Sequence, residues 1–445
     1  MIARFSPPVD VLIVGAGPAG ATAARALALA GVRVQLLDRA AFPRNKPCGG
    51  GISARVLTRF PYLERELPRI ATHGVSRLRL EGPDGDAVVV ESDGPAALMI
   101  RRVEFDALLV SMAQSAGADV VAGADVVHAA EVDDGVTLTT RAGRRFDAPI
   151  VIAADGVHSV VARRLGLNTG WPASAVALDM MEETPRTALR DLDPSMLWVA
   201  YGYEPSPQSH VNPQSSRTPH AASRKALSGY AYIFPKRDHV NIGIGYVLSH
   251  YKESIGVAPY ELQRGFIDRL RERGIVEGDS VRSNFTPFLI PIGGPLRTPG
   301  CGRVLLAGDA GGFVNGFTAE GIYYAMVSGE LAARAILESR GNVRGLARRY
   351  SKACNYEIGA ELRDSVAIQR FLFADRRRIA RVIDGAGRER AATKLILEFA
   401  AGRRSYRDVR RRLLGRFPLL AGRLVWDWLC RSGAQKKVVE RRAAF

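Results

Sequence analysis

The feature that most constrains this chain is a glycine-rich turn near its N-terminus, GAGPAG at Gly15–Gly20. It follows an apolar run at Val9–Val14 and opens an alanine-rich segment at Pro18–Ala30, and a second apolar run follows at Val32–Leu37. Short apolar runs bounded by turn residues predict buried strands, and the segment between them predicts a helix. The first forty residues therefore predict a βαβ unit, which belongs to a parallel sheet with helices on its faces.

The turn has the G-x-G-x-x-G spacing of dinucleotide-binding folds. Gly15 permits the tight turn, Gly17 lets a pyrophosphate approach the backbone, and Gly20 lets the helix pack on the strand. The helix N-terminus offers free N–H groups to the phosphates. Asp38 ends the second strand, 18 residues after Gly20, where a carboxylate can accept the ribose hydroxyls. The predicted contacts of this unit are Gly15, Gly17, Ala19, Gly20, Asp38 and Arg39.

Two further motifs distinguish FAD from NAD. Asp155-Gly156 follows the apolar run Ile150–Ala153, and Gly308-Asp309 follows Arg303–Ala307. A strand-end aspartate can hydrogen-bond a ribityl hydroxyl. A helix starting near Thr318 would direct its N–H groups at the N1/O2 edge of the flavin, where reduced flavin carries negative charge. Three motifs in this order predict an FAD protein of the hydroxylase-like, two-domain type. Their predicted contacts are Asp155, Gly156, Gly308, Asp309, Gly321 and Ile322.

The remaining chain predicts a second sheet and a helical end. From about Ala173 to Phe288, alternating runs such as SGYAYIFP and HVNIGIGYV predict a largely antiparallel sheet. Within it, Pro205–Lys225 is rich in Ser, Pro, Gln and His and predicts a mobile loop or lid. The predicted fold class is α/β: a Rossmann-type FAD-binding domain interleaved with a mainly antiparallel β-sheet substrate domain, plus a C-terminal helical region. We place these parts at 1–172 with 287–340, at 173–286 with part of 60–100, and at 341–445.

Three motifs carry a resemblance to a known family. The string FPRNKPCGGGIS at Phe42–Ser53, the run YAYIFPK at Tyr230–Lys236 and the run GDAGGFVNGFTAEGIYYAM from Gly308 are similar to motifs of the geranylgeranyl reductase family of FAD-dependent enzymes. The motifs span about three quarters of the chain. Three departures bear on the substrate more than on the flavin: Gly316 stands where the family usually has Pro, Ala319 where it usually has Gly, and Tyr232 where some members have Trp.

The resemblance implies reduction of isolated C=C bonds in a polyprenyl chain, with an isoprenoid lipid or prenyl diphosphate as substrate. Substrate classes in the family are geranylgeranyl diphosphate, geranylgeranylated chlorophyll, unsaturated ether lipids and the tail of menaquinone. An isolated alkene is not electrophilic, so a proton donor must act at one carbon while reduced FAD gives hydride to the other. The chain has no second dinucleotide fingerprint, so NADPH, NADH and ferredoxin all stay open as the reducing partner.

Cys48 and Tyr232 are the candidate catalytic residues. A thiol with an ordinary pKa of about 8.5 is mostly protonated at neutral pH, so Cys48 could donate or relay the proton. The alternative is that Cys48 only packs there while water or Tyr232 supplies the proton. Gly49 and Gly50 would let the loop lie against the flavin ring. Lys46 would touch the flavin or a phosphate, or be a solvated lysine.

Tyr230, Tyr232 and Phe234 alternate along one predicted strand, so their side chains share a face. They would line a prenyl tunnel together with Pro235, or they would be core aromatics. Arg102 begins an R-x-x-F-D string, and in the wider superfamily that arginine contacts FAD; a helix-start surface arginine is the alternative.

The charge of the chain is concentrated at its C-terminal end. Residues 375–445 hold 20 Lys/Arg and 7 Asp/Glu, a net +13 of the +17 of the whole chain. Cations interleaved with Leu, Trp426 and Trp428 are typical of a helix lying in a membrane interface, and a merely solvated helical region is the alternative. We therefore expect peripheral contact with an anionic membrane, and no nucleic-acid partner.

Composition and segment length exclude several protein classes. The chain is 47% apolar and 24% charged, which is typical of a globular protein. It shows no signal peptide and no uninterrupted apolar run of about 18 residues, so we expect a cytoplasmic location, with contact to the inner face of the membrane. Four scattered cysteines predict neither a disulfide framework nor a metal site. A flavin monooxygenase or halogenase on the same fold, and a non-redox FAD-binding protein, are the alternative functions.

Overall fold

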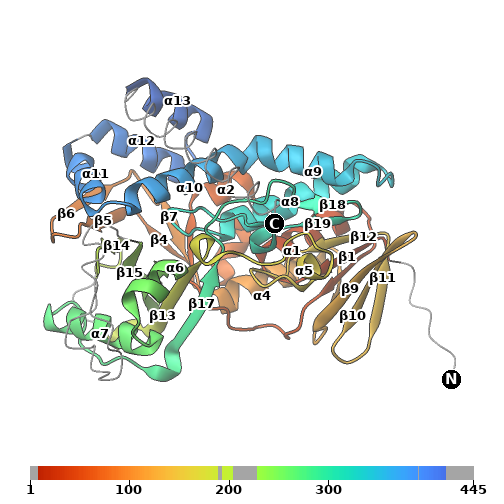
Figure 1. The fold of residues 1–445 in the computed structure, drawn as a ribbon, viewed down its shortest axis with the longest axis horizontal. Coiled ribbons are helices and arrows are strands. Elements are labelled where there is room, and N and C mark those ends of the chain that lie inside the picture. Colours follow the sequence, from red (N-terminus) through yellow and green to blue (C-terminus); the bar gives the residue numbers. More distant parts are fainter. Residues whose placement is uncertain (1–8, 189–192, 204–227, 389, 417–445) are drawn as a thin grey trace, which may run out of the picture.

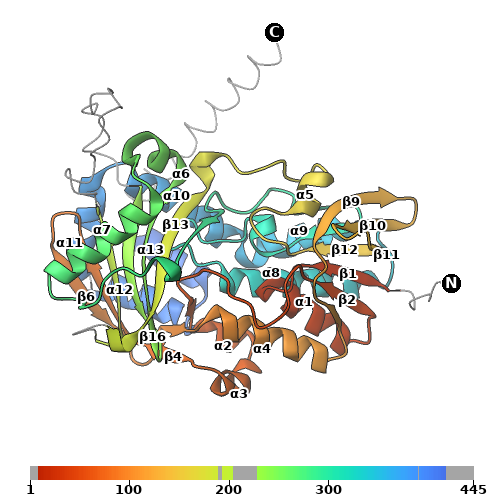
Figure 2. The same ribbon diagram turned by 90° about the horizontal axis from the view of Figure 1, so that it is seen from below.

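A computed structural model describes residues 9–188, 193–203, 228–388 and 390–416 (Figures 1 and 2). A mainly parallel sheet occupies one end of the molecule and a mainly antiparallel sheet the other. Helices α8 (Ile322–Ser339) and α9 (Leu346–Cys354) lie at the end that carries the parallel sheet. Helices α10 to α13, between Ala360 and Arg416, lie at the end that carries the antiparallel sheet. The predicted α/β fold class, with a Rossmann-type FAD-binding part, an antiparallel sheet and C-terminal helices, is confirmed. The limits of the two domains stay a prediction.

The parallel sheet has six strands in the order β18-β19-β12-β1-β2-β8, and β18 is its one antiparallel member. Its strands are β1 (Val11–Val14), β2 (Val34–Leu37), β8 (Asp119–Val121), β12 (Ile150–Ala153), β18 (Gly300–Cys301) and β19 (Val304–Leu306). The expected βαβ unit is confirmed, with α1 at Pro18–Leu29 between β1 and β2. The central strands β1 and β12 are apolar and buried throughout because both faces of the sheet are covered.

One face of this sheet packs on helices and the other on a small sheet. Buried side chains of β1 and β2, such as Ile13 and Leu36, meet α1, α4 (Arg102–Ser115) and α8 (Ile322–Ser339). The opposite side chains, such as Leu12 and Val14, meet a three-stranded sheet and α5. The elements of this second cover are β9 (Val126–Val132), β10 (Gly135–Thr140), β11 (Arg145–Ala148) and α5 (Val160–Arg164).

The antiparallel sheet has seven strands in the order β17-β13-β16-β15-β14-β5-β6, and only β14 and β5 run parallel. Its strands are β5 (Arg77–Glu81), β6 (Ala87–Glu91), β13 (Ala177–Pro185), β14 (Met196–Tyr201), β15 (Gly229–Pro235), β16 (His239–Val247) and β17 (Phe285–Ile290). One face packs on α7 (Pro259–Glu272) through residues such as Ile233 and Phe266. The other face turns toward α10 (Ala360–Phe373) and α11 (Arg376–Arg388).

The remaining elements link the two large sheets or extend the helical end. A second small sheet and two short helices join the parts: β3 (Gly51–Ser53), β4 (His73–Val75), β7 (Ala97–Met99), α2 (Arg55–Arg59) and α3 (Leu63–Glu66). The other helices are α6 (Leu248–His250), α9 (Leu346–Cys354), α12 (Arg390–Ala400) and α13 (Tyr406–Arg416). No helix within the described ranges is both long and apolar enough to cross a bilayer. The predicted lid at Pro205–Lys225, and Trp426 and Trp428, lie outside the described residues.

The helix expected to start near Thr318 starts four residues later, at Ile322, so that expectation is wrong in its boundary. The preceding residues form a turn instead. The Asn315 side-chain oxygen accepts the backbone N–H groups of Phe317 and Thr318, each at 3.0 Å. Ala319 then takes a left-handed conformation with φ of +55°. An Asn side chain that satisfies nearby N–H groups competes with helix formation, which delays the start of α8.

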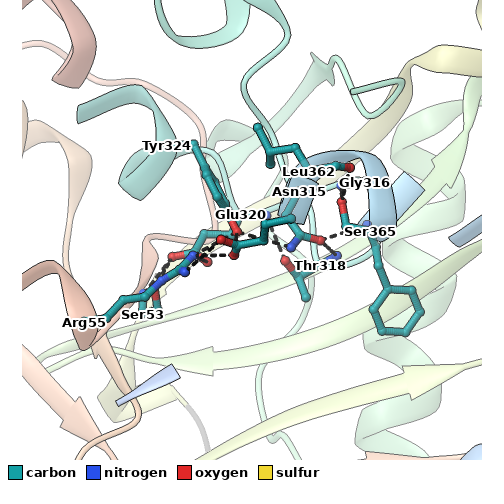
Figure 3. A network of polar contacts seen from close by, with 11 residues as sticks. Ser53, Arg55, Asn315, Gly316, Thr318, Glu320, Tyr324, Leu362 and Ser365 are labelled. Atoms are coloured by element: carbon teal, nitrogen blue, oxygen red, sulfur yellow. Dashed lines mark hydrogen bonds and ion pairs between the residues drawn. The ribbon is translucent and has the colours of Figure 1, made fainter. Parts of the chain in front are cut away.

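A network of polar contacts fixes this turn to the rest of the molecule (Figure 3). The Glu320 carboxylate accepts the backbone N–H and the hydroxyl of Ser53, at 2.8 and 2.7 Å. The Arg55 guanidinium donates to the Ser53 hydroxyl at 3.0 Å and to the Tyr324 hydroxyl at 2.8 Å. The Gly316 N–H donates to the Ser365 hydroxyl at 2.8 Å, a bond that a proline could not make. The turn before α8 is therefore held from β3, α8 and α10 at once.

Ala319→Gly should raise the stability of the protein, because Ala319 occupies a backbone region that costs a non-glycine residue about 1–2 kcal/mol. We expect a gain of about 1 kcal/mol in the free energy of unfolding, measured by urea denaturation followed by circular dichroism. Ala380→Gly, within α11, is the matched control and should lower stability by about 0.5–1 kcal/mol. A loss of stability in both variants would contradict the strained turn.

Candidate active site

The predicted cofactor motifs meet at one edge of the parallel sheet. Strands β19, β12, β1 and β2 are neighbours, and each runs directly into one of the motifs. Those motifs are Gly308-Asp309, Asp155-Gly156, Gly15–Gly20 and Asp38. The strand order reverses between β1 and β12, and ligands of such sheets bind outside the carboxyl ends at this switch point. The arrangement gives the four motifs one shared ligand position.

The glycine turn leaves its outer side open. Gly15 has φ of +96°, and a Cβ there would lie 2.3 Å from the Ala154 carbonyl oxygen, so only glycine fits. A Cβ at Gly17 would meet only the Arg44 side chain, at 3.9 Å. Among the described residues, no side chain caps α1 and no acid stands in its first turn. The space beside Gly17 and the free N–H groups of the helix therefore fit a pyrophosphate.

Asp38 ties the turn to the next strand. One carboxylate oxygen accepts the Ala16 N–H at 2.8 Å and the other accepts the Ala40 N–H at 2.9 Å. Each carboxylate oxygen has a further lone pair, so both can also accept a ribose hydroxyl. Arg39, predicted beside it, is exposed.

Arg44 is a site residue that the sequence analysis missed. Its guanidinium lies 3.3 Å from the Asp106 carboxylate and 3.9 Å from that of Asp38, next to the open side of Gly17. A cation at this place would attract the pyrophosphate. Its position in the string FPRNKPCGGG, two residues before Lys46, was the available signal.

One carboxylate oxygen of Asp155 holds the start of α5, and the other makes no hydrogen bond among the described residues. Its Oδ2 accepts the N–H groups of Val160 and Val161, at 2.7 and 3.2 Å, at the start of α5. Its Oδ1 is buried with no hydrogen-bond partner among the described residues. Burial raises the pKa of Asp155, and its bonds to Ser159 and to backbone N–H groups oppose that rise. Because Gly156 next to it borders open space, the orphaned oxygen fits a cofactor hydroxyl.

Lys46, Arg102 and Asp309 form an electrostatic cluster. Burial raises the pKa of the Asp309 carboxyl, while Lys46 and Arg102 oppose the rise. Burial likewise lowers the pKa of Lys46, and Arg102 lowers it further. Arg102 is not a surface arginine: its guanidinium forks onto Asp106 at 2.6 and 2.7 Å, and it lies beside Cys48. The cluster brings three predicted cofactor residues together from different motifs.

The residues that lead into α8 lie beside the same cofactor motifs, next to Asp309 and α1. Gly308 has φ of +61°, and a Cβ there would lie 3.1 Å from that of Ala19 in α1. Gly321 precedes the first helical residue, Ile322, and a Cβ on Gly321 would lie 3.5 Å from Asp309 Oδ1. The α8 N-terminus thus stands next to Asp309, as the motif order predicts.

The loop at residues 46–51 lies between the cofactor motifs and the aromatic strand. A Cβ on Gly49 would lie 2.9 Å from the Phe234 ring, and one on Gly50 would lie 2.2 Å from the Ile100 carbonyl oxygen. The Asn241 side-chain N–H donates to the Cys48 carbonyl at 3.1 Å, and the Gly50 N–H donates to Cys48 Sγ at 3.4 Å. The half-buried thiol of Cys48 is therefore fixed beside β15 and β16.

The three aromatic residues of β15 share a face, as predicted. Ring centroids of Tyr232 and Phe234 lie 4.4 Å apart, and those of Tyr230 and Tyr232 lie 6.2 Å apart. The Tyr230 hydroxyl donates to the Thr318 carbonyl at 2.7 Å, which links the strand to the turn before α8. Pro235 is buried at the strand end.

A buried lysine next to this strand was not predicted as a site residue. Lys236 is fully buried, pairs with Glu183 and lies 3.0 Å from the Cβ position of Gly50. Glu183 also accepts a bond from Arg101 at 2.8 Å. Burial opposes a drop in the pKa of Glu183, but these two cations lower it. The resulting charge-paired group anchors the loop at residues 46–51. Within the described ranges, no cluster of His, Cys, Asp or Glu is arranged to hold a metal ion.

Gly17→Val should fold normally and yet fail to retain FAD. The new side chain meets nothing closer than 3.9 Å from its Cβ, and Gly17 has an extended backbone that valine adopts readily, but it fills the space open to the pyrophosphate. We expect loss of the yellow flavin absorbance with unchanged far-ultraviolet circular dichroism. Gly265→Val on α7, where the nearest atom is 3.8 Å away, is the control that should keep FAD. Stoichiometric FAD in Gly17→Val would refute this role of the turn.

Comparison with known proteins agrees with this geometry. Residues 8–229 match the family model described as an FAD binding domain. The chain is 32% identical over 375 residues to a menaquinone reductase of Mycobacterium tuberculosis, covering 82% of this chain and 85% of that protein. It is 29% identical to digeranylgeranylglycerophospholipid reductase 2 of Methanothermobacter thermautotrophicus, over 82% and 87%. Identity to a chloroplastic geranylgeranyl diphosphate reductase of Oryza sativa is 31%, over 75% and 67%.

Solved structures show the same fold. A geranylgeranyl bacteriochlorophyll reductase-like protein of Thermoplasma acidophilum superposes with a TM-score of 0.70 at 22% identity, covering 91% of this chain and 98% of that one. A flavin-dependent brominase superposes with a TM-score of 0.63 at 16% identity, over 89% and 94%. At such identities the likeness concerns the fold alone. The identity to the reductases, together with the FAD motifs at the sheet edge, shows that this chain belongs to the geranylgeranyl reductase family of FAD-dependent oxidoreductases.

Proposed function

We propose that the protein saturates isolated C=C bonds in the prenyl chain of a membrane-derived or diphosphate-headed isoprenoid. Its relatives carry names of reductases for menaquinone, for digeranylgeranylglycerophospholipid and for geranylgeranyl diphosphate, which differ in headgroup. What these substrates share is the polyprenyl chain, so the chain rather than the headgroup is the part that we assign to this site.

The position of the loop at residues 46–51 is the observation that carries the proposal. Lys46 at its start interacts with Asp309 of the cofactor side, and Gly49 contacts Phe234 of the antiparallel sheet. Cys48 lies between these two contacts. A group that passes a proton to a substrate held on β15, next to a bound flavin, would need this location.

The face of the antiparallel sheet to which we assign the prenyl chain is apolar. This face, toward α10 and α11, carries Tyr201 and Tyr230, and their rings lie 5.9 Å apart. Across from them, Phe317 and Phe373 lie 6.2 and 6.4 Å from Tyr201. Leu80 and Val199 extend this face and are only partly buried. An alkene hydrocarbon gains from burial against such side chains, roughly 25 cal/mol for each Å² removed from water.

Reduced FAD, when bound, supplies the hydride. The chain itself must supply a proton to the other alkene carbon, and we assign this step to the Cys48 thiol. The Arg102 guanidinium beside the sulfur and the Gly50 N–H that points at it would stabilise the thiolate left behind. Because the loop is fixed to Asn241 by its backbone, the thiol needs no rearrangement to reach this position.

The proposal is tested by anaerobic mixing of the dithionite-reduced holoenzyme with each class of prenyl lipid. Flavin reoxidation together with a product heavier by two hydrogen atoms per bond, detected by mass spectrometry, is the expected result. Geranylgeranyl diphosphate, a digeranylgeranyl ether lipid and a menaquinone are the three substrates to compare. Flavin that stays reduced in every anaerobic mixture, with each prenyl chain recovered unchanged, would refute a prenyl reductase.

Cys48→Ala should keep FAD but lose most of the prenyl reduction. Loss of a general acid commonly lowers a rate by about 10²–10⁴. The measurement is the rate of substrate-dependent flavin reoxidation, with flavin absorbance as the check on cofactor content. Cys301→Ala, at an exposed cysteine of β18, is the matched control and should react at the parent rate. A Cys48→Ala rate within about twofold of the parent would make Cys48 a packing residue only.

We also propose that the C-terminal region contacts anionic membrane. Several of its arginines are neutralised within the protein, such as Arg376 by Asp84 and Arg410 by Asp364. Arg377 and Arg381 of α11 are exposed, and Val382 beside them is 50% exposed. Insertion of apolar side chains and attraction of cations to anionic lipid are two signals that together can hold a protein on a bilayer. Such contact would spare a lipid substrate passage through water.

The protein should bind phosphatidylglycerol vesicles at low salt and dissociate as salt rises, because charges are screened beyond about 10 Å at 0.1 M. Trp426→Ala with Trp428→Ala should weaken binding at every salt concentration, and so should Val382→Asp. Leu29→Asp, at an exposed leucine of α1, is the control and should bind like the parent. Failure of the parent to sediment with vesicles at low salt would show that the cationic helices are merely solvated.

A further inference from the structure

A buried carboxyl that the mechanism above does not use lies next to the loop at residues 46–51, which we call the catalytic loop because it carries the proposed proton donor Cys48. Asp179 is the third residue of β13 and is only 5% exposed. Its Oδ2 accepts the hydroxyl of Tyr232 at 3.0 Å. Asp179 pairs with Gly245 of β16 and with Phe288 of β17, so its side chain shares the face on which Tyr230 and Tyr232 lie. A carboxyl in this position requires an explanation, because burying an unpaired charge is costly.

The neighbouring strand is built to allow this contact. Tyr232 on β15 and Asp179 on β13 are separated by β16, so the Tyr232 ring must cross over that strand. It does so at Gly243, its direct partner on β16, where a Cβ would lie 2.3 Å from the phenol ring carbon Cζ. Any side chain at Gly243 would displace the ring from Asp179. Strands β15 and β13 thus contribute Tyr232 and Asp179, and β16, which lies between them, leaves space for the Tyr232 ring at Gly243.

No cation of the described residues forms an ion pair with Asp179. Lys46 acts on it from the catalytic loop but forms no ion pair with it among the described residues, and Lys46 faces Asp309 as well. Tyr230 and Tyr232 face it from β15, while β16 and β17 present Gly245 and Phe288. Farther along β13, Glu183 is occupied by Lys236 and Arg101.

Burial raises the pKa of Asp179 to about 7, although the Tyr232 hydroxyl and Lys46 both act to lower it. Asp179 therefore exchanges between its carboxylic acid and carboxylate forms in the neutral pH range. Burial also raises the pKa of Tyr232 well above its ordinary value, and negative charge on Asp179 or Cys48 raises it further. Tyr232 can pass a proton on only if another group replaces that proton at once.

We propose that Asp179, acting through Tyr232, stores the proton that converts the Cys48 thiolate back to the thiol after each reduction. The inference rests on the proposed function. Tyr232 contacts Gly49, the residue after Cys48, with its ring 3.6 Å from the Cβ position. Asp179 is a positioning residue, because Tyr232 stands between it and the loop.

The proton balance is simple. The double bond takes hydride from reduced FAD and a proton from the Cys48 thiol, which leaves an alkane and a thiolate. When Asp179 is protonated, its carboxylic acid donates to the Tyr232 oxygen instead of accepting from it, and the Tyr232 hydroxyl proton can then turn to the thiolate. That proton passes to the thiolate as the Asp179 proton passes to the Tyr232 oxygen. The Asp179 carboxylate then regains a proton from water. No further oxidant or reductant is needed, and the relay works only while Asp179 is protonated, that is, below about pH 7.

The first test needs no substrate. Infrared difference spectra between the parent and Asp179→Asn isolate the carboxylic acid band of Asp179, and its loss with rising pH should have a midpoint of about 7. Tyr232→Phe removes a hydrogen bond that favours the carboxylate, so the midpoint should rise. A midpoint near the ordinary aspartate value of about 4, or one that Tyr232→Phe leaves unchanged, would overturn the proposal.

The second test separates one turnover from many. Asp179→Asn keeps an oxygen that can accept the Tyr232 hydroxyl but carries no transferable acid. The first reoxidation of its reduced flavin by prenyl substrate should stay within about twofold of the parent, because Cys48 already holds its proton. Steady-state kcat under excess dithionite should fall by about tenfold or more, and its decline above pH 7 should disappear.

Three outcomes are informative. Parent-like steady-state turnover with the parent pH profile would overturn the proposal, and so would an equal loss in both phases, which would mark a structural role. Failure of the parent itself to reduce any prenyl chain would instead refute the proposed function, while the infrared titration would still decide whether Asp179 and Tyr232 form a coupled acid pair.

Discussion

Direct contact between backbones at the glycine turn is the constraint on which the rest of the structure depends. A Cβ on Gly20 would lie 1.9 Å from the Gly15 carbonyl oxygen, and one on Gly329 of α8 would lie 2.1 Å from that of Ala19. Helix α1 is thus packed between the turn and α8 with no side chain in the way. Because α8 starts beside Asp309, this packing also sets the distance between the pyrophosphate end and the flavin end of the site.

The catalytic loop is the second connection between the parts of the site, and its position depends on the packing of the glycine turn, α1 and α8. Its start, Lys46, is held electrostatically by Asp309 at the end of β19, and its glycines press on β15. Lys236, buried against Gly50 and paired with Glu183, fixes the loop to the antiparallel sheet at this point. Cys48, to which we assign the proton transfer, therefore lies where two independently covered sheets meet, and neither sheet alone could form this position.

Local sequence predicts the parts of this site that follow strand ends, and misses those that are set by pairing across a sheet. The glycine turn, Asp38 and Asp309 follow apolar runs at fixed spacing, so their convergence could be predicted from parallel strands. The start of α8 could not, because the Asn315 side chain closes a turn where the helical pattern already begins. Asp179 lies within a buried strand, and only the order of β13, β16 and β15 brings it to Tyr232.

The two carboxyls of β13 on this face show how the nearest cation decides between a structural and a chemical role. Glu183 meets Lys236 and Arg101 at contact distance, and their charges lower its pKa in spite of burial, so it stays ionised and fixes the loop. Among the described residues, Asp179, four residues away on the same face, meets a phenol and a more distant lysine but no cation at ion-pair distance, and burial raises its pKa to about 7. An acid that is neither permanently charged nor permanently neutral near pH 7 is what a proton store requires. The same strand thus supplies the anchor of the active site and its exchangeable proton.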